Sequence, residues 1–302
     1  MSTIWKNIKA NFKNGSSYTR LLYINIGVFL ILQFFVVPDF LINGIKQLEK
    51  TQIYLFSKDY LFLPSDINQL LMKPWTLLSY MFIHFDFFHI LFNLIVLHFG
   101  SKLFLQYFTG KQLISTYILG GIFGGLIYIL VFNIFPVFKS APYVGSVAIG
   151  ASAAVLAIFI AIATYKPNYR VNLTFIGNTS IKNIAIFLVI LDFLLISQDN
   201  AGGHIAHLGG AMFGYLYIIL LKKGYDISLN FYNIIGVFNF TKTRKPRKKS
   251  RKKRSSKGND DLFRSKKSEK QKKINIVLEK ISKSGYDSLT KEEKELLFKE
   301  SK

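Results

Sequence analysis

The sequence contains no cysteine, and it has far fewer acidic than basic residues. The lack of cysteine excludes disulfides and any thiolate nucleophile or metal ligand. The 17 Asp and Glu face 39 Lys and Arg, which gives a formal net charge of +22, yet 50% of the chain is hydrophobic and 29 residues are Phe. A soluble domain does not need both a high hydrophobic content and a large positive charge, whereas a membrane domain with a basic tail accounts for both.

The positive charge is concentrated at the end of the chain. Residues 241–302 hold 23 Lys and Arg against 9 Asp and Glu, a net charge of +14. The N-terminus has no signal-peptide pattern, so we expect the first apolar run to stay as an anchor. The sequence thus predicts four parts: a cytoplasmic N-terminal arm (1–20), a membrane domain (21–222), a basic disordered linker (223–269) and a small helical C-terminal segment (270–302).

Six apolar segments are long enough to be considered as membrane spans: 21–37, 85–104, 112–135, 149–165, 181–197 and 204–221. A helix crosses the hydrocarbon core with about 20 apolar residues. An isolated strand cannot satisfy its backbone in lipid, so all six should be helical. We therefore predict an all-α polytopic membrane protein, a six-helix bundle with a basic cytoplasmic tail, in which segment 149–165 is among the shortest spans.

The distribution of basic residues also predicts orientation. Lys and Arg are frequent in the N-terminal arm, in the tail, and in the connections after spans two and four. The opposite connections are poorer in positive charge for their length. By the positive-inside rule both termini are cytoplasmic, and spans two, four and six run from outside to inside. We expect a multi-pass integral protein of a bacterial cell membrane.

A shared direction places several polar side chains at one depth. The three even-numbered spans each end at a cytoplasmic lysine: Lys102, Lys166 and Lys222. At a rise of about 1.5 Å per residue, His89, Ser152 and His207 stand about 20, 21 and 22 Å above these lysines, respectively. Asn93 lies one turn below His89 on the same face. Each residue alone could be a satisfied interhelical hydrogen bond, but four at one level, including a serine and two histidines, favour a functional site.

Small residues on the same faces would let the helices approach closely. Gly210 and Gly214 share a helix face with His207, and Gly150 precedes Ser152 among alanines. Glycine and alanine permit close backbone contact between membrane helices. Spans four and six are therefore expected to pack tightly enough for a Ser152–His207 hydrogen bond.

These motifs resemble the rhomboid family of intramembrane serine proteases. The sequences "HILFN" (89–93), "GASA" (150–153) and "AHLGGAMFG" (206–214) match the family signatures on its second, fourth and sixth core helices, in the right order. Residues 75–93 also look like the family's entry into its second helix. The resemblance covers about 20–222 and not the tail. It implies the bacterial six-helix type of fold.

The resemblance also implies roles for individual residues. Ser152 is the nucleophile and His207 its general base, while His89, Asn93 and the Ser152 backbone N–H form the oxyanion hole. Gly150 matches the glycine of the serine motif. Three positions depart from the common pattern: Ala153 replaces Gly, Leu156 replaces an aromatic that packs on the histidine, and Thr76 replaces Arg after Trp75. Support of the His207 ring is therefore in question.

The chemistry is consistent with the resemblance. A serine hydroxyl is a poor nucleophile unless an adjacent imidazole takes its proton, and the unpaired N–H groups at a helix N-terminus suit an oxyanion. We expect no membrane carboxylate to orient His207 and so infer a dyad, with Asp192 in a local hydrogen bond. The function predicted is an endopeptidase that cleaves in or near transmembrane helices. The alternatives are a non-catalytic relative that binds such helices, and a small transporter.

The remaining features suggest partners rather than cofactors. We expect a structural hydrogen bond for His84, no role for His204, and His98 too near the cytoplasm to reach Ser152. A metal site among the histidines is possible, but no HExxH pattern supports it, and we predict no cofactor. The run 241–257 should attract anionic lipid, whereas nucleic-acid binding is disfavoured because aromatics are not interleaved. Thr290 and Glu293 form a capping-box pattern in the C-terminal segment.

Overall fold

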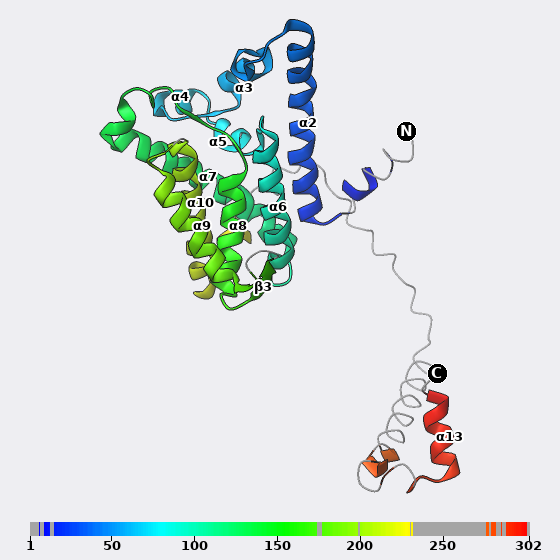
Figure 1. Ribbon diagram of the computed structural model, residues 1–302. Coiled ribbons are helices and arrows are strands. Elements are labelled where there is room, and N and C mark those ends of the chain that lie inside the picture. The colour runs from blue at the N-terminus through cyan, green and yellow to red at the C-terminus, as the bar shows by residue number, and fades with distance from the viewer. Residues whose placement is uncertain are drawn as a thin grey trace, which may run out of the picture. The chain divides into compact units, whose positions relative to one another are not determined.

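The computed structural model describes residues 6, 9–12, 15–173, 177–198, 200–229, 231, 276–277, 279–281, 285 and 288–300. The chain divides into two compact units, Met1–Phe240 and Thr241–Lys302. The larger unit holds the bundle of long helices (Figure 1).

One helix covers most or all of each of the six predicted apolar segments. They are α2 (Ser17–Asn43), α6 (Phe87–Phe104), α7 (Gly110–Ile134), α8 (Ser152–Tyr165), α9 (Ile181–Leu195) and α10 (Ala201–Lys222). Four of them, α2, α6, α7 and α10, are long and apolar enough to cross a membrane. Helix α8 has 14 residues and α9 has 15, which is short of the usual 20. The helical membrane domain agrees with the prediction, and the count of six spans stays a prediction.

Short elements fill the connections. Between α2 and α6 lie η1 (Leu48–Lys50), α3 (Gln52–Tyr60), β1 (Leu63–Pro64), α4 (Ile67–Met72), α5 (Thr76–Ser79) and η2 (Tyr80–Phe82). After α7 come η3 (Pro136–Lys139) and β2 (Val147–Ala148), and β3 (Arg170–Leu173) and β4 (Gly177–Ser180) separate α8 from α9. Strand β1 pairs antiparallel with β2, and β3 with β4. The first pairing attaches the long connection before α6 to the segment that leads into α8.

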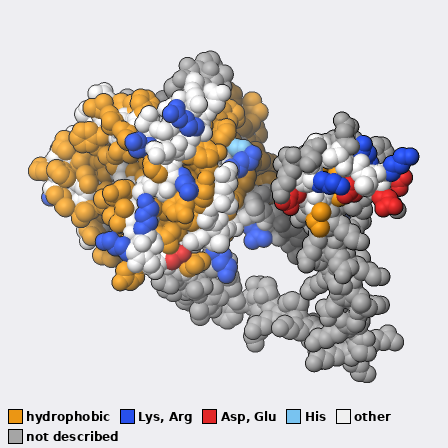
Figure 2. Space-filling model, turned by 90° about the horizontal axis from the view of Figure 1, so that it is seen from below, with side chains coloured by type: hydrophobic (Ala, Val, Ile, Leu, Met, Phe, Trp, Pro, Cys, Tyr) orange, Lys and Arg blue, Asp and Glu red, His pale blue; other side chains and the backbone are white. Residues whose placement is uncertain are grey.

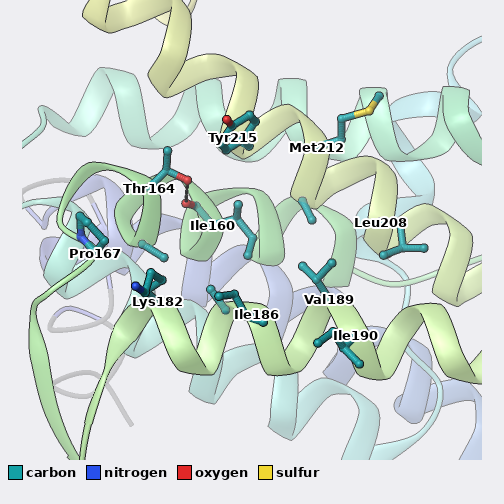
Figure 3. Close-up of a pocket in the computed structure, with 13 residues that line it drawn as sticks. Ile160, Thr164, Pro167, Lys182, Ile186, Val189, Ile190, Leu208, Met212 and Tyr215 are labelled. Atoms are coloured by element: carbon teal, nitrogen blue, oxygen red, sulfur yellow. Dashed lines mark hydrogen bonds between the residues drawn. The ribbon is translucent and has the colours of Figure 1, made fainter.

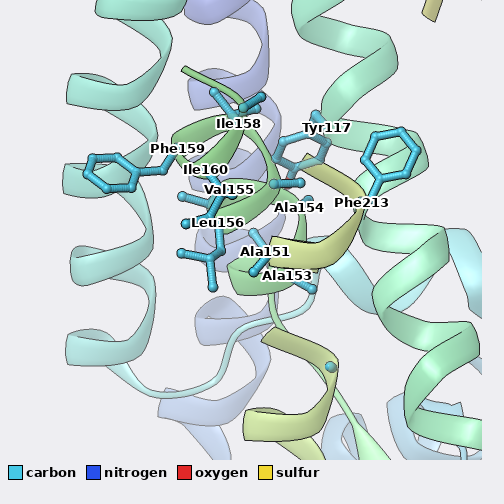
Figure 4. Close-up of a cluster of buried hydrophobic side chains, with 14 of the residues drawn as sticks. Tyr117, Ala151, Ala153, Ala154, Val155, Leu156, Ile158, Phe159, Ile160 and Phe213 are labelled. Atoms are coloured by element: carbon cyan, nitrogen blue, oxygen red, sulfur yellow. The ribbon is translucent and has the colours of Figure 1, made fainter. Parts of the chain in front are cut away.

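Helix α8 lies at the centre of the bundle and is apolar on all sides. Eleven of its 14 residues are buried. Figure 4 shows its side chains surrounded by other helices, with Tyr117 of α7 and Phe213 of α10 packed beside it. A helix that is apolar all round is expected to be buried. Its first residue is consequently held inside the protein.

Glycines allow α7, α8 and α10 to approach closely. A Cβ at Gly210 would overlap the Ala153 carbonyl oxygen, and one at Gly214 would overlap that of Ala157. In α7, a Cβ at Gly124 would meet the Ala206 oxygen at 2.6 Å. Only a residue without a side chain fits at these crossings. The two glycines singled out in the sequence of α10 thus lie directly against α8.

The packing of the larger unit continues past Lys222. Ser228 is fully buried and its Oγ lies 3.0 Å from the Tyr217 hydroxyl. Gln112 of α7 donates a hydrogen bond to Asp226 at 2.8 Å. The expected end of the membrane domain at residue 222 therefore omits contacts made by the next few residues.

In the smaller unit, α13 (Lys291–Glu300) begins with the predicted capping box. The Thr290 N–H donates to Glu293 Oε2 at 2.8 Å, and the Glu293 N–H donates to Thr290 Oγ1 at 3.3 Å. Lys280 Nζ lies 2.9 Å from Glu293 Oε2. The basic run 241–257 lies outside the described residues.

Candidate active site

Ser152 is the first residue of α8, and no side chain caps this helix. The first described backbone bond of the helix is from the Val155 N–H to the Ala151 oxygen, at 2.9 Å. The N–H groups before Val155 in the first turn have no acceptor within the helix, because intrahelical bonds begin four residues in. These donors and the positive end of the helix dipole surround the Ser152 hydroxyl.

The two residues before Ser152 are fixed by the connection that precedes α6. The Gly150 N–H donates to the Tyr80 oxygen at 2.9 Å, and the Ala151 N–H donates to His84 Nε2 at 3.1 Å. The structural hydrogen bond expected for His84 is thus present, and its acceptor, His84 Nε2, binds the backbone of the residue before Ser152. Because β1 also pairs with β2, this connection holds the approach to α8 at three points.

Gly150 is required by both conformation and space. Its φ is +109°, a value that L side chains rarely adopt. A Cβ there would lie 2.6 Å from Cε1 and 2.7 Å from Nε2 of His89. The glycine therefore lets the His89 ring approach the backbone beside Ser152.

His207 lies in the second turn of α10, and its Nε2 is 2.5 Å from Ser152 Oγ. Its other ring nitrogen, Nδ1, is 2.8 Å from Oδ1 of Asp192 in α9. An ionised carboxylate can only accept hydrogen bonds, so Nδ1 carries the proton and Nε2 can accept from the serine hydroxyl. Three residues from three helices thus form one continuous hydrogen-bonded chain.

This contact overturns the expectation that no carboxylate lies near His207. Asp192 does not make a local bond: its partners are on the next helix, at a separation of 15 residues for His207 and 12 for His204. His204, for which no role was expected, lies in the first turn of α10 rather than in a loop, and its Nδ1 is 2.8 Å from the same Asp192 oxygen. The sequence departure at Leu156 left open what supports the His207 ring, and Asp192 supplies that support.

The other two predicted site residues lie on the opposite wall. Asn93 is buried and its Nδ2 donates to the His89 backbone oxygen at 2.9 Å, which leaves the second amide hydrogen available. The His89 ring packs edge-on against the His84 ring at 5.1 Å between centroids. His98, by contrast, bonds Tyr18 of α2 and does not line the site.

All of these groups line one cavity of about 300 Å³. Helices α6 and α9 supply its apolar walls, with Phe92 and Val96 on one side and Leu188 and Leu191 on the other. The polar residues gather at one place in it: His89, Asn93, Ser152, Asp192, His204 and His207. The depth argument from the sequence had grouped four of these six.

A second, larger hollow of about 530 Å³ lies on the other face of α9, between α8, α9 and α10. Figure 3 shows side chains that line it, among them Ile186, Val189 and Ile190 of α9 and Leu208 and Met212 of α10. The described residues that line it include no histidine and no carboxylate. Ser152, His207 and Asp192 thus line the first cavity and not this one.

In the described part of the chain, one group of side chains could hold a metal ion: Asp192, His204 and His207. A ligand atom from each lies within 4.8 Å of the other two. Since two of these residues belong to the hydrogen-bonded chain of Ser152, the candidate metal ligands overlap the candidate active site.

Comparison with known proteins places this geometry in a family. A profile of the rhomboid domain matches residues 72–224, about half of the chain. A profile described as a family of unknown function matches residues 259–302. Presenilin-associated rhomboid-like proteins of mitochondria, from Homo sapiens and Pongo abelii, are each 26% identical over 195 residues, which is 58% of this chain and 43% of theirs. The chain spans less than half the length of these relatives.

The rhomboid match contains Ser152, its partner His207, the Asp192 that bonds His207, and the glycines that pack α10 on α8. Four long apolar helices accompany it, as in an integral membrane protein. The chain belongs to the rhomboid family, which includes intramembrane serine proteases.

Proposed function

We propose that this protein is an intramembrane serine endopeptidase that hydrolyses peptide bonds in or near transmembrane helices. The observation that carries the proposal is the chain of hydrogen bonds from Ser152 through His207 to Asp192, with heavy-atom distances of 2.5 and 2.8 Å. A serine bonded to an imidazole that is itself oriented by a third group is the usual arrangement for serine nucleophiles.

In the proposed reaction, Ser152 Oγ attacks the scissile carbonyl carbon while His207 Nε2 takes its proton. His207 then returns that proton to the leaving amine, and water releases the acyl enzyme by the reverse sequence. Negative charge develops on the carbonyl oxygen in both steps. The backbone N–H of Ser152, with His89 and Asn93 on the opposite wall, would stabilise this oxyanion, and losing one such donor typically costs about a hundredfold or more in rate.

Asp192 extends the sequence-based dyad. By accepting from Nδ1–H it fixes the tautomer in which Nε2 can act as a base, and it stabilises the imidazolium that forms during attack. Asp192 does not touch the substrate in this scheme. It is a positioning residue.

The shape of the cavity supports a transmembrane substrate. Its apolar walls come from α6 and α9, and exposed apolar side chains of these helices include Phe92, which lines the cavity, and Phe187. A substrate segment entering between these helices would pass from lipid to the polar end of the cavity. A helical peptide bond is shielded, so helix-breaking or small residues near the cut should favour cleavage.

The proposed topology has six spans in a bacterial cell membrane, with both termini cytoplasmic. Figure 2 looks at the end of the bundle where β3 lies in Figure 1, and on the larger unit it shows Lys and Arg side chains spread among apolar ones. Basic side chains at this end of the bundle are in line with the positive-inside rule, which the proposed orientation uses. Anionic lipid is the proposed partner of the basic tail, at about 1 kcal/mol per charge near the surface.

The alternative is a rhomboid-like protein that binds transmembrane helices without cleaving them. Purified protein in detergent, incubated with a labelled single-span substrate, separates the two. Protease activity predicts new fragments from the wild type, and intact substrate that co-purifies with Ser152→Ala. Capture of intact substrate by both proteins, with no fragments from either, would support the alternative.

A further inference from the structure

His204 is the polar residue of the cavity that the proposed reaction does not use. Its Nδ1 and that of His207 both lie 2.8 Å from a single oxygen, Asp192 Oδ1. The two histidines are at positions i and i+3 of α10, so they share a face of that helix. Two imidazoles and a carboxylate therefore converge on one point.

We propose that Asp192, His204 and His207 form an inhibitory zinc site. Imidazole nitrogens and carboxylate oxygens are ordinary zinc ligands, and sites with three protein ligands keep a fourth position for water. Neighbouring ligands of a tetrahedral zinc lie about 3.3 Å apart, since Zn–N distances are about 2.0–2.1 Å. The ligand atoms here include pairs at 2.8 Å and lie within 4.8 Å of one another, so small side-chain rotations would fit them to the ion.

The three ligands are accessible from the cavity. The side chains of Asp192, His204 and His207 are 13%, 16% and 22% exposed, respectively. The cavity of about 300 Å³ leaves space for a water molecule on the ion. The negative charge of a carboxylate partly removed from water is stabilised by a bound cation, and the two neutral histidines would help to hold that cation.

Zinc at this point would block the nucleophile through the histidine tautomer. A neutral imidazole that binds metal through Nδ1 carries its proton on Nε2. His207 Nε2, which is 2.5 Å from Ser152 Oγ, would then donate to the serine oxygen and could not take its proton. Asp192 would be drawn to the ion as well. The inhibitory effect rests on the proposed protease function, whereas binding of the ion does not.

A purely structural role for His204 makes different predictions. If its hydrogen bond only fixes Asp192, replacing it changes the rate or the stability but creates no difference in response to zinc. The measurement that separates the two is therefore metal affinity, compared between variants of the full-length chain in detergent after removal of any histidine tag and treatment with a chelator.

Binding is measured first on Ser152→Ala, which needs no catalysis. Calorimetry with Zn²⁺ should give about one equivalent, and Co²⁺ should produce the visible absorption of a low-coordinate site. Adding His204→Asn should weaken Zn²⁺ binding about tenfold or more. His98→Asn is the matched control, because it removes a histidine that lies outside the cluster. Absence of binding, or equal affinity with and without His204, overturns the proposal.

Inhibition is measured on the wild type with a transmembrane substrate. Zn²⁺ should stop cleavage reversibly, with recovery on adding EDTA, and His204→Asn should need about tenfold more Zn²⁺ relative to its own metal-free rate. Binding without inhibition overturns the inhibitory role. A wild type that never cleaves any substrate contradicts the protease function instead, and the binding measurement still decides the zinc site.

Discussion

Asp192 is the residue on which the sequence and the structure differ most. Its depth in the predicted bundle differs little from those of Ser152 and His207, yet we expected only a local hydrogen bond for it. The side-chain lengths of Asp192 and His207 cover that difference, and their heavy atoms are 2.8 Å apart. A depth estimate from one sequence resolves a layer of the membrane but not which side chains in it touch.

Replacing Asp192 by Asn should lower kcat about tenfold to a hundredfold with little change in KM. The amide can donate to His207 Nδ1, which favours the wrong tautomer of the base. Initial rates at varied substrate concentration, beside thermal melts of both proteins, measure this effect. Partial recovery in Asp192→Glu would support positioning by a carboxylate. An unchanged kcat in Asp192→Asn would show that Ser152 and His207 work as a dyad.

His84 makes the stability of the site depend on pH. Burial, with a smaller effect of the nearby His89, lowers the pKa of His84 from 6.5 to about 4, and its Nε2 accepts from the Ala151 N–H. As the pH falls below 6.5 the unfolded chain gains a proton that the folded chain does not. Folding stability should therefore decrease down to about pH 4, by roughly 3 kcal/mol at most, and then level off.

Thermal melts of the wild type and His84→Gln in detergent, from neutral pH to about pH 5, test this dependence. A glutamine side chain at this position cannot titrate, so the melting temperature of the variant should fall less over this range. Parallel curves for the two proteins would mean that His84 is not responsible. The quantity compared is the slope of melting temperature against pH. This comparison removes the effect that the substitution itself has on stability at all pH values.

At the scale of elements, the six helices could be predicted from apolar length, and the α8–α10 contact from glycine and alanine spacing. The antiparallel pairing of β1 with β2, which precedes α8, could not be predicted from the sequence. Each strand has two residues, too few to show an alternating pattern. The register depends on contacts between parts of the chain more than 80 residues apart, such as Leu63 with Ala148.

Gly210→Ala should destabilise the bundle by roughly 1–3 kcal/mol and reduce activity, because its Cβ would overlap the Ala153 oxygen and push α10 from α8. Gly27→Ala in α2 is the matched control. A Cβ there has nothing within 4 Å, and alanine favours a helix over glycine by up to about 1 kcal/mol. In thermal melts, the melting temperature should fall below that of the wild type for Gly210→Ala and rise slightly above it for Gly27→Ala. Equal melting temperatures would contradict the close contact.

For the whole molecule, composition predicts an apolar bundle followed by a basic tail, but it does not indicate which polar residues after the last apolar run pack on the bundle. Asp226 and Ser228 follow the last apolar run, in a polar context typical of a linker. They nevertheless bond Gln112 and Tyr217 of the larger unit. Only the folded bundle shows the contact of Asp226 with Gln112, because these two residues are 114 positions apart in the sequence.

Two truncations test where the catalytic unit ends. Ending the chain at Phe240 should leave cleavage in neutral detergent unchanged, because the site lies about 20 Å from the proposed cytoplasmic face and salt screens the charge of the tail over about 8 Å. Ending it at Lys223 should lower the melting temperature through loss of the Asp226 and Ser228 contacts. A large loss of activity in the first truncation, with an intact melt, would show that the tail is coupled to the site.

Ser152 is the proposed nucleophile of an intramembrane protease. The most direct test of this role is the initial rate at which purified wild type and Ser152→Ala cleave a fluorescent single-span substrate in detergent, with the products identified by mass spectrometry. The account predicts fragments cut in or near the membrane segment by the wild type, and none above background from Ser152→Ala, which should melt at the same temperature. Cleavage at the same bond by Ser152→Ala, or no cleavage by the folded wild type of a panel of such substrates, would contradict it.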